Sequence, residues 1–184
     1  MDPHMLLMLV AAGIPIVASY SLWFKETDIS ERHHSHHDTY VIGSTLTWSL
    51  VLAMIFMGAL GVLLGWLCMV GVFEVDASVP LGFFDGFLVV SAVYWWLLKR
   101  YKVVTYDDHM EVTPFVGRKV TISYRQISAM EWTPSVVIRN GRNVRVFVGN
   151  KSRALLWSAL DLDQILIRID RFDALTETPS RRTA

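Results

Sequence analysis

Three long apolar stretches fill the first half of this sequence, and they constrain its fold more than any other feature. The first covers about residues 5–24, the second about 43–72 and the third about 79–98. A helix rises ~1.5 Å per residue, so about twenty apolar residues cross the ~30 Å hydrocarbon core of a bilayer. The sequence therefore predicts a membrane region over residues 1–98 that contains three transmembrane helices.

A cleaved signal peptide is the alternative interpretation of residues 5–24. A signal peptide starts with Lys or Arg and ends at small residues. This stretch has no basic residue before it and ends in Trp23-Phe24-Lys25. A retained span is therefore favoured, and Pro15 is expected to kink its middle.

Basic residues indicate which side of the membrane each connection occupies. Three of them directly follow the third stretch, namely Lys99, Arg100 and Lys102. The first loop contains Lys25 and Arg32, whereas the turn at 74–78 has no Lys or Arg. Because Lys and Arg are enriched in cytoplasmic loops, we expect the N-terminus outside and residues 99–184 in the cytoplasm. Lys99, Arg100 and Lys102 are then expected to lie at the membrane surface.

Charge is unevenly distributed, although the formal net charge of the 184 residues is zero. From Lys99 to Asp173, 13 Lys and Arg residues outnumber 8 Asp and Glu residues. A basic domain tethered to a bilayer has anionic lipid as its nearest partner. Arg139, Arg142 and Arg145 are candidates for contact with a partner, but they form too small a patch to predict nucleic-acid binding.

Small residues recur at helical spacing within the second stretch. Gly58, Gly61 and Gly65 lie three or four positions apart, and therefore on one face of a helix. Small residues at this spacing let two membrane helices approach closely. This face is predicted to pack on another helix, either of this chain or of another subunit. The general abundance of glycine in membrane helices is the alternative explanation.

Histidines cluster after the first stretch, at His33, His34, His36 and His37. Neutral imidazoles close together bind zinc, copper or nickel. A solvated linker is the simpler interpretation, because adjacent histidines in a loop do not form a preorganised site. No histidine lies inside a predicted span, which excludes a bis-histidine haem in the bilayer.

Asp85 is the one Asp, Glu, Lys, Arg or His residue within a predicted span. A carboxylate in a membrane helix indicates a proton or cation path. Asp85 also lies near the start of its span, only a few residues after Pro80. A position at the interface, with the carboxylate reaching water, is therefore the favoured alternative.

After residue 99 the pattern changes to short alternating segments, which are typical of strands. The predicted strands are 102–105, 110–113, 119–124, 127–132, 136–139, 144–148 and 154–157. Asn140-Gly141 tolerates positive φ and predicts a tight hairpin between the fifth and sixth strands. Apolar residues then recur every three or four positions from Leu160 to Phe172, which predicts an amphipathic helix. Residues 176–184 are polar and are expected to be a disordered tail.

Seven short strands and a closing helix are the pattern of a pleckstrin-homology (PH) barrel. Lys99-Arg100-Tyr101-Lys102, Asp107-Asp108-His109 and the segment Ile122–Ile127 resemble bacterial PH-like membrane proteins of the YdbS/YcxB kind, over about residues 99–173. The resemblance implies a PH-like β-barrel with a C-terminal capping helix. Together with the three predicted spans, it gives three transmembrane helices followed by this barrel, in the inner membrane of a bacterium. It also implies a scaffold or interaction module over residues 99–175. Acidic residues occupy the turn where phosphoinositide-binding PH domains have Lys and Arg.

The sequence contains no GxSxG, P-loop, HExxH or dinucleotide-binding motif. Its single cysteine, Cys68, cannot form an intrachain disulfide. We therefore expect a non-enzymatic membrane subunit or accessory protein without a cofactor. Its helices would join other subunits or a second copy of the chain, and its soluble domain would dock a cytoplasmic partner or the inner leaflet. Metal binding by the histidines and ion or proton translocation through Asp85 are the alternatives.

Overall fold

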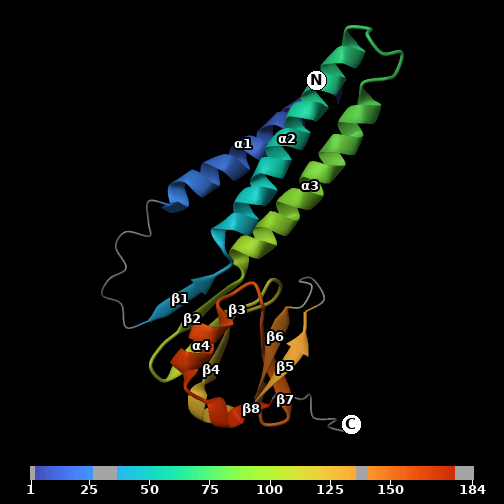
Figure 1. Ribbon diagram of the computed structural model, residues 1–184. Helices are drawn as coiled ribbons and strands as arrows, with labels where there is room; N and C mark the ends of the chain where they lie inside the picture. The colour runs from blue at the N-terminus through green and yellow to red at the C-terminus, as the bar shows by residue number, and fades with distance from the viewer. Residues whose placement is uncertain (1–2, 27–36, 136–140, 177–184) are drawn as a thin grey trace. The chain divides into compact units, whose positions relative to one another are not determined.

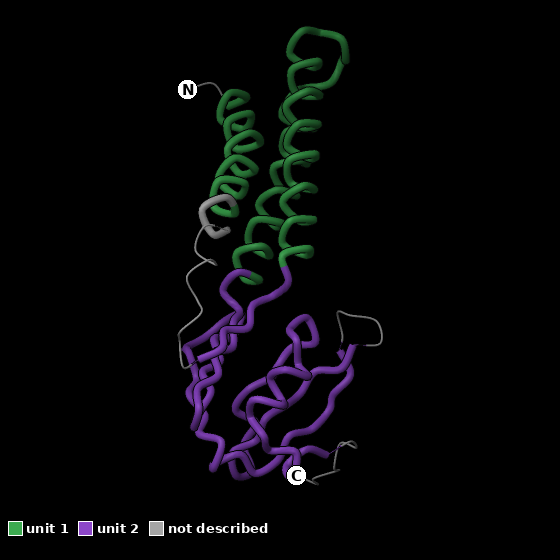
Figure 2. The backbone as a smooth tube through the Cα atoms, turned by 60° about the vertical axis from the view of Figure 1, so that its left-hand side comes forward, with its two compact units in different colours: residues 1–33, 44–98 green, residues 34–43, 99–184 purple. Residues whose placement is uncertain are grey.

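The computed structural model describes residues 3–26, 37–135 and 141–176. The chain divides into two compact units, one helical and one rich in strands (Figure 2). The helical unit contains residues 1–33 and 44–98, and the β unit contains residues 34–43 and 99–184. The chain therefore contributes to the β unit twice, once before the second helix and once after the third.

The helical unit consists of α1 (Pro3–Glu26), α2 (Ser44–Met69) and α3 (Ser78–Arg100) (Figure 1). All three are long and apolar enough to cross a membrane, so the three predicted spans are confirmed in length and composition. Large side chains on the outer surface are apolar, with Ile16, Phe83 and Val90 66%, 68% and 70% exposed. A helix bundle that is apolar on its outside as well as its inside suits lipid rather than water.

The core of the helical unit is built from side chains of all three helices. Its buried members are Ala11, Ala18, Leu22, Val51, Met54 and Leu88. His4, at the start of α1, lies beside Asp76 in the turn between α2 and α3, with 3.3 Å between His4 Nε2 and Asp76 Oδ1. This contact places the start of α1 at the α2–α3 turn, so α1 and α2 run antiparallel.

The first sheet of the β unit contains β1 (Asp38–Val41), β2 (Lys102–Thr105), β3 (His109–Thr113) and β4 (Val120–Ser123). The four strands are antiparallel and lie in chain order. β1 is not among the strands predicted from the sequence. Four residues carry little periodicity, and this strand forms only because Tyr40 pairs with Val103, far along the chain.

The second sheet contains β5 (Ile127–Pro134), β6 (Arg142–Val148), β7 (Lys151–Leu156) and β8 (Leu175–Thr176), in the order β7-β6-β5-β8. A short 3-10 turn, η1 (Tyr124–Gln126), connects the two sheets. No ladder of hydrogen bonds joins the sheets among the described strands, so the predicted closed barrel is wrong in this respect. The coarser expectation of a small β domain with a C-terminal helix is confirmed.

The predicted hairpin at Asn140-Gly141 is also corrected. β6 pairs with β5, in a register that sets Val144 against Trp132 and Arg142 against Pro134. Segment 136–139, predicted as the partner strand, lies outside the described residues. The glycine signal was correct for a chain reversal but gave the wrong register, because the loop is longer than two residues.

The C-terminal helix α4 (Leu162–Ile169) follows its predicted amphipathic pattern. Leu162, Ile165, Leu166 and Ile169 are buried. The Asp161 carboxylate caps the helix by accepting a hydrogen bond from the Gln164 N–H at 3.2 Å. A second 3-10 turn, η2 (Phe172–Ala174), follows α4 and leads into β8. The expected tail lies outside the described residues, apart from Thr176, which belongs to β8.

Candidate functional site

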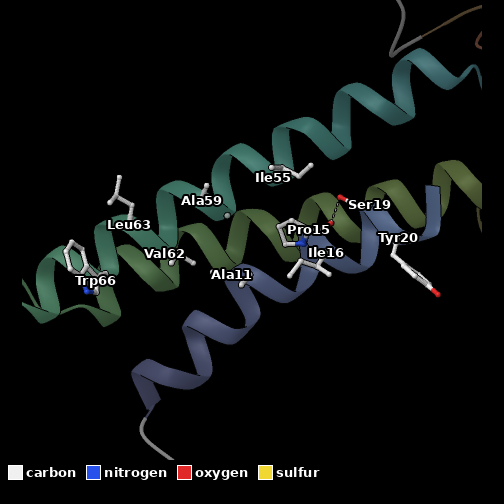
Figure 3. A pocket seen from close by; sticks show the side chains of 12 residues that line it. Ala11, Pro15, Ile16, Ser19, Tyr20, Ile55, Ala59, Val62, Leu63 and Trp66 are labelled. Carbon is white, nitrogen blue, oxygen red and sulfur yellow. Dashed lines mark hydrogen bonds between the residues drawn. The ribbon is translucent and has the colours of Figure 1, made fainter. Parts of the chain in front are cut away.

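An apolar groove lies between α1 and α2 in the helical unit (Figure 3). Its volume is about 960 Å³. The lining comes from both helices and consists of Ala11, Ala12, Pro15, Ile16, Ser19, Tyr20, Ile55, Gly58, Ala59, Val62, Leu63 and Trp66. The α2 residues extend over three turns of helix, or about 16 Å along its axis at ~1.5 Å per residue.

Small residues bring the two helices together along one side of this groove. Pro15 has no N–H, so it cannot donate the usual helical hydrogen bond to the Ala11 carbonyl. That carbonyl points at Gly58: a Cβ atom at Gly58 would lie 2.6 Å from Ala11 O and 2.8 Å from Pro15 Cγ. Only glycine permits this approach. The Ser19 hydroxyl donates to the Pro15 carbonyl at 2.7 Å and is satisfied inside α1.

The other two glycines of the predicted packing face contact α3. A Cβ atom at Gly61 would lie 2.9 Å from Phe84 Cβ, and one at Gly65 would lie 2.8 Å from Leu81 Cδ2. Gly58, Gly61 and Gly65 are all buried. The structure therefore places this face against the chain's own helices, so another subunit would have to contact a different surface.

The groove offers such a surface. Ala12 and Ala59 are exposed within it, and larger apolar side chains such as Ile16 and Leu63 stand at its sides. The lining contains no acidic or basic residue, so the groove is suited to an apolar occupant. The groove was not predicted from the sequence. Its small residues can be read there, but they line one groove only because a particular face of α1 meets α2.

Asp85 lies on the inner face of α3, so its carboxylate does not reach water as the favoured alternative expected. Asp85 is 6% exposed. It lies between Leu81 and Leu88 at helical spacing, and both of these leucines are fully buried. Neither carboxylate oxygen has a hydrogen-bond partner among the described residues. Distance along the helix axis suggested the interface, whereas the rotation of the helix turns this residue inward. An ionised carboxylate that is buried without a partner is unfavourable, so this position marks Asp85 as a candidate functional residue.

The predicted membrane-surface residues lie where α3 joins the β unit. Lys99 and Arg100 form the last turn of α3, and Lys102 is the exposed first residue of β2. Between them Tyr101 is buried, and its hydroxyl donates to the Leu155 carbonyl at 2.7 Å and accepts from the Trp157 N–H at 3.0 Å. Burial raises the pKa of Tyr101 to about 12.

The predicted partner-binding arginines are not gathered into one patch by the described strands. Arg142 and Arg145 are exposed on β6, three positions apart, so strand alternation directs them to opposite faces. Arg139 lies outside the described residues. A small cavity of about 330 Å³ lies beside Arg142 and the start of α4, and Trp132, Ser158 and Asp161 also line it.

The histidine cluster is described only at its last member. His33, His34 and His36 lie outside the described residues, so metal binding there stays a prediction. The exposed His37 ring packs against Tyr106 at 5.3 Å between centroids, and His109 stacks on the same tyrosine at 4.4 Å. Within residues 3–26, 37–135 and 141–176, no three His, Cys, Asp or Glu side chains are placed to hold a metal ion.

Comparisons with models of known protein families, with curated proteins and with solved structures find no match for this chain.

Proposed function

We propose that this chain is a non-enzymatic accessory or scaffold subunit of a larger membrane complex, and that its α1–α2 groove receives a transmembrane helix of another subunit. The observation that supports this most directly is the groove itself, which is apolar, about 960 Å³ in volume and floored by small residues. In this proposal the membrane is the bacterial inner membrane, with the N-terminus outside and the β unit in the cytoplasm.

The shape of the groove favours a helix as its occupant. Helices in lipid associate through close packing, because lipid tails are as apolar as leucine side chains and give no hydrophobic driving force. Close packing needs small residues at the contact, and Ala12 and Ala59 supply them on adjacent helices. Larger side chains at the sides, including Ile55 and Trp66, would hold a helix in register.

The β unit serves the same role on the water-exposed side. The cavity beside Arg142 and Asp161 presents both charges and a buried Ser158 hydroxyl without a hydrogen-bond partner among the described residues. Such a mixed polar surface is suited to a protein partner, because protein interfaces combine a packed centre with a polar rim.

Site-specific photocrosslinking in native membranes tests the groove. A photoreactive phenylalanine analogue at Ala59 should form a discrete crosslinked product with one membrane protein. The same analogue at Val90, which is 70% exposed on α3 away from the groove lining, should not. Ala12→Phe should abolish the product from position 59. Crosslinking of both positions to the same mixture of proteins, or to lipid alone, would exclude a helix-binding groove.

Proton or cation binding at Asp85 is a second candidate function, favoured by its two buried oxygens without partners among the described residues. Liposomes containing the purified chain should then show an ion or proton flux that Asp85→Asn removes. Ser91→Ala, at another buried polar position of α3, is the matched control. Equal flux in wild type and Asp85→Asn would end this candidate.

A further inference from the structure

We propose that the turn between β3 and β4, residues 114–119, is an anchor that inserts Val116 into the headgroup region of a bilayer containing anionic lipid. This inference depends on the membrane spans and not on the α1–α2 groove.

Strand register places this turn at the membrane-connected end of the first sheet. Val41, the last residue of β1, pairs with Lys102, the first residue of β2. Lys102 in turn pairs with Thr113, the last residue of β3. α2 starts at Ser44, soon after β1 ends, and α3 ends at Arg100, just before β2 begins. Two of the three aligned strand ends are thus joined to membrane helices by very short links, and the third leads into the turn.

Two contacts inside the β unit fix the conformation of the turn. Phe115 points inward, where its ring stacks on Tyr101 at 4.4 Å between centroids and meets Trp157 edge-on at 5.3 Å. The guanidinium of Arg100, the last residue of α3, donates to the Gly117 carbonyl. Gly117 has φ of +107°, which favours glycine and allows the sharp reversal. The turn is therefore tied directly to the residue at which α3 ends.

The same anchoring exposes an apolar tip. Val116 is 77% exposed, more than any other large apolar side chain of the described residues. A valine held outward by the inward anchoring of its neighbour loses little conformational freedom when it enters an apolar medium. Insertion of a few apolar side chains, assisted by nearby basic residues, is a common mode of interfacial membrane binding.

The distribution of charge along the sheet favours contact of this end with anionic lipid. Arg118 is exposed next to the tip, and Lys102 is exposed on the neighbouring strand. Lys119 also lies in the turn and is paired with Glu111 at 2.9 Å. The opposite end of the sheet carries Asp38, Asp107 and Asp108, of which the first two are paired with Arg168. Basic residues near a membrane surface are attracted to anionic lipid at about 1 kcal/mol each.

A single fluorophore on the turn tests this placement in the full-length chain. The only cysteine is Cys68, so Cys68→Ala provides a background for one new cysteine. Val116→Cys carries an environment-sensitive dye, and Asp108→Cys, at the opposite end of the sheet, is the control. The chain is reconstituted in nanodiscs of phosphatidylcholine, or of equal parts phosphatidylcholine and phosphatidylglycerol, each doped with lipid carrying a nitroxide near the headgroup.

We expect a blue-shifted dye at position 116 that the nitroxide lipid quenches, and a water-exposed dye at position 108. Quenching at 116 should increase with phosphatidylglycerol. Arg118→Gln should lower the ratio of inserted to water-exposed dye roughly fivefold in the anionic nanodiscs, as expected for one basic residue. Equal quenching at 116 and 108 overturns the anchor. Equal quenching at 116 in the two lipid mixtures overturns its assignment to anionic lipid.

Discussion

The three glycines of α2 allow a graded prediction, because the atoms that a new methyl group would meet differ in how far they can move. At Gly58 the neighbour is the backbone carbonyl oxygen of Ala11, at 2.6 Å. At Gly61 it is Phe84 Cβ, at 2.9 Å, and at Gly65 it is the Leu81 side chain, with Cγ and Cδ2 both at 2.8 Å. A backbone atom cannot yield without moving a helix, and a Cβ atom moves only with its backbone, whereas a leucine side chain can change its rotamer.

Replacement of each glycine by alanine should therefore destabilise the helical unit in the order Gly58, Gly61, Gly65. Overpacking of a tight core costs about 1–3 kcal/mol, so we place Gly58→Ala near the upper end and Gly65→Ala at or below the lower end. Gly82→Ala and Gly86→Ala in α3 are matched controls, because a Cβ atom there meets nothing within 4 Å. These controls should be neutral or stabilising by up to about 1 kcal/mol.

Denaturation of the purified chain by sodium dodecyl sulfate in mixed micelles, followed by circular dichroism, gives the free energies of unfolding. We expect a clear separation in the free energy of unfolding between Gly58→Ala and the two α3 controls. If Gly58→Ala unfolds at the same detergent fraction as Gly82→Ala, the close approach of α1 and α2 does not exist. If Gly65→Ala is the most destabilising of the three, the mobility of the neighbouring atoms does not set the energetic cost.

Three further predictions concern the β unit. Tyr101→Phe should destabilise it by about 1–3 kcal/mol, because the buried Trp157 N–H loses its acceptor, and hydrogen exchange should be faster in β2 and β7. The folded chain holds the Tyr101 pKa at about 12 against an ordinary value of 10.0. The unfolded chain therefore loses this proton first, so the stability that the neutral phenol contributes is complete below about pH 10 and is lost as the pH rises towards about 12. A pH series of thermal melts should show a smaller alkaline loss in Tyr101→Phe than in wild type. Asp161→Ala should cost about 1 kcal/mol by removing the cap of α4, and Asp161→Asn, which retains an acceptor, should cost less; equal losses would refute the capping role.

Features carried by local periodicity could be predicted from the sequence. The three membrane helices and α4 follow from uninterrupted or regularly spaced apolar residues. β2 was predicted with its observed bounds, since Lys102–Thr105 lies between a helix end and an acidic turn. These signals are contained within one segment and need no knowledge of the partner.

Features that depend on distant pairing could not be predicted. β1 is defined by β2, which lies about sixty positions further along the chain, and the two sheets are separated by η1 instead of closing into a barrel. The burial of Asp85 was not predicted, because its depth along α3 was considered without the rotation of that helix. The groove depends on Pro15 and Gly58 meeting across two helices, which spacing within either helix does not reveal.

The sidedness of the chain tests the proposed architecture most directly. Pairing of β1 with β2 requires residues 38–41 and the β unit to share one side of the membrane, with the α2–α3 turn on the other. In the Cys68→Ala background, single cysteines at His37, Glu74 and Asn150, all exposed, can be labelled in intact cells with a membrane-impermeant maleimide. We predict that only the cysteine at Glu74 reacts before the membrane is opened, and that those at His37 and Asn150 react together afterwards. If the cysteines at positions 37 and 150 react from opposite sides, or if all three cysteines react from one side, the result contradicts three alternating spans joined to a shared β unit.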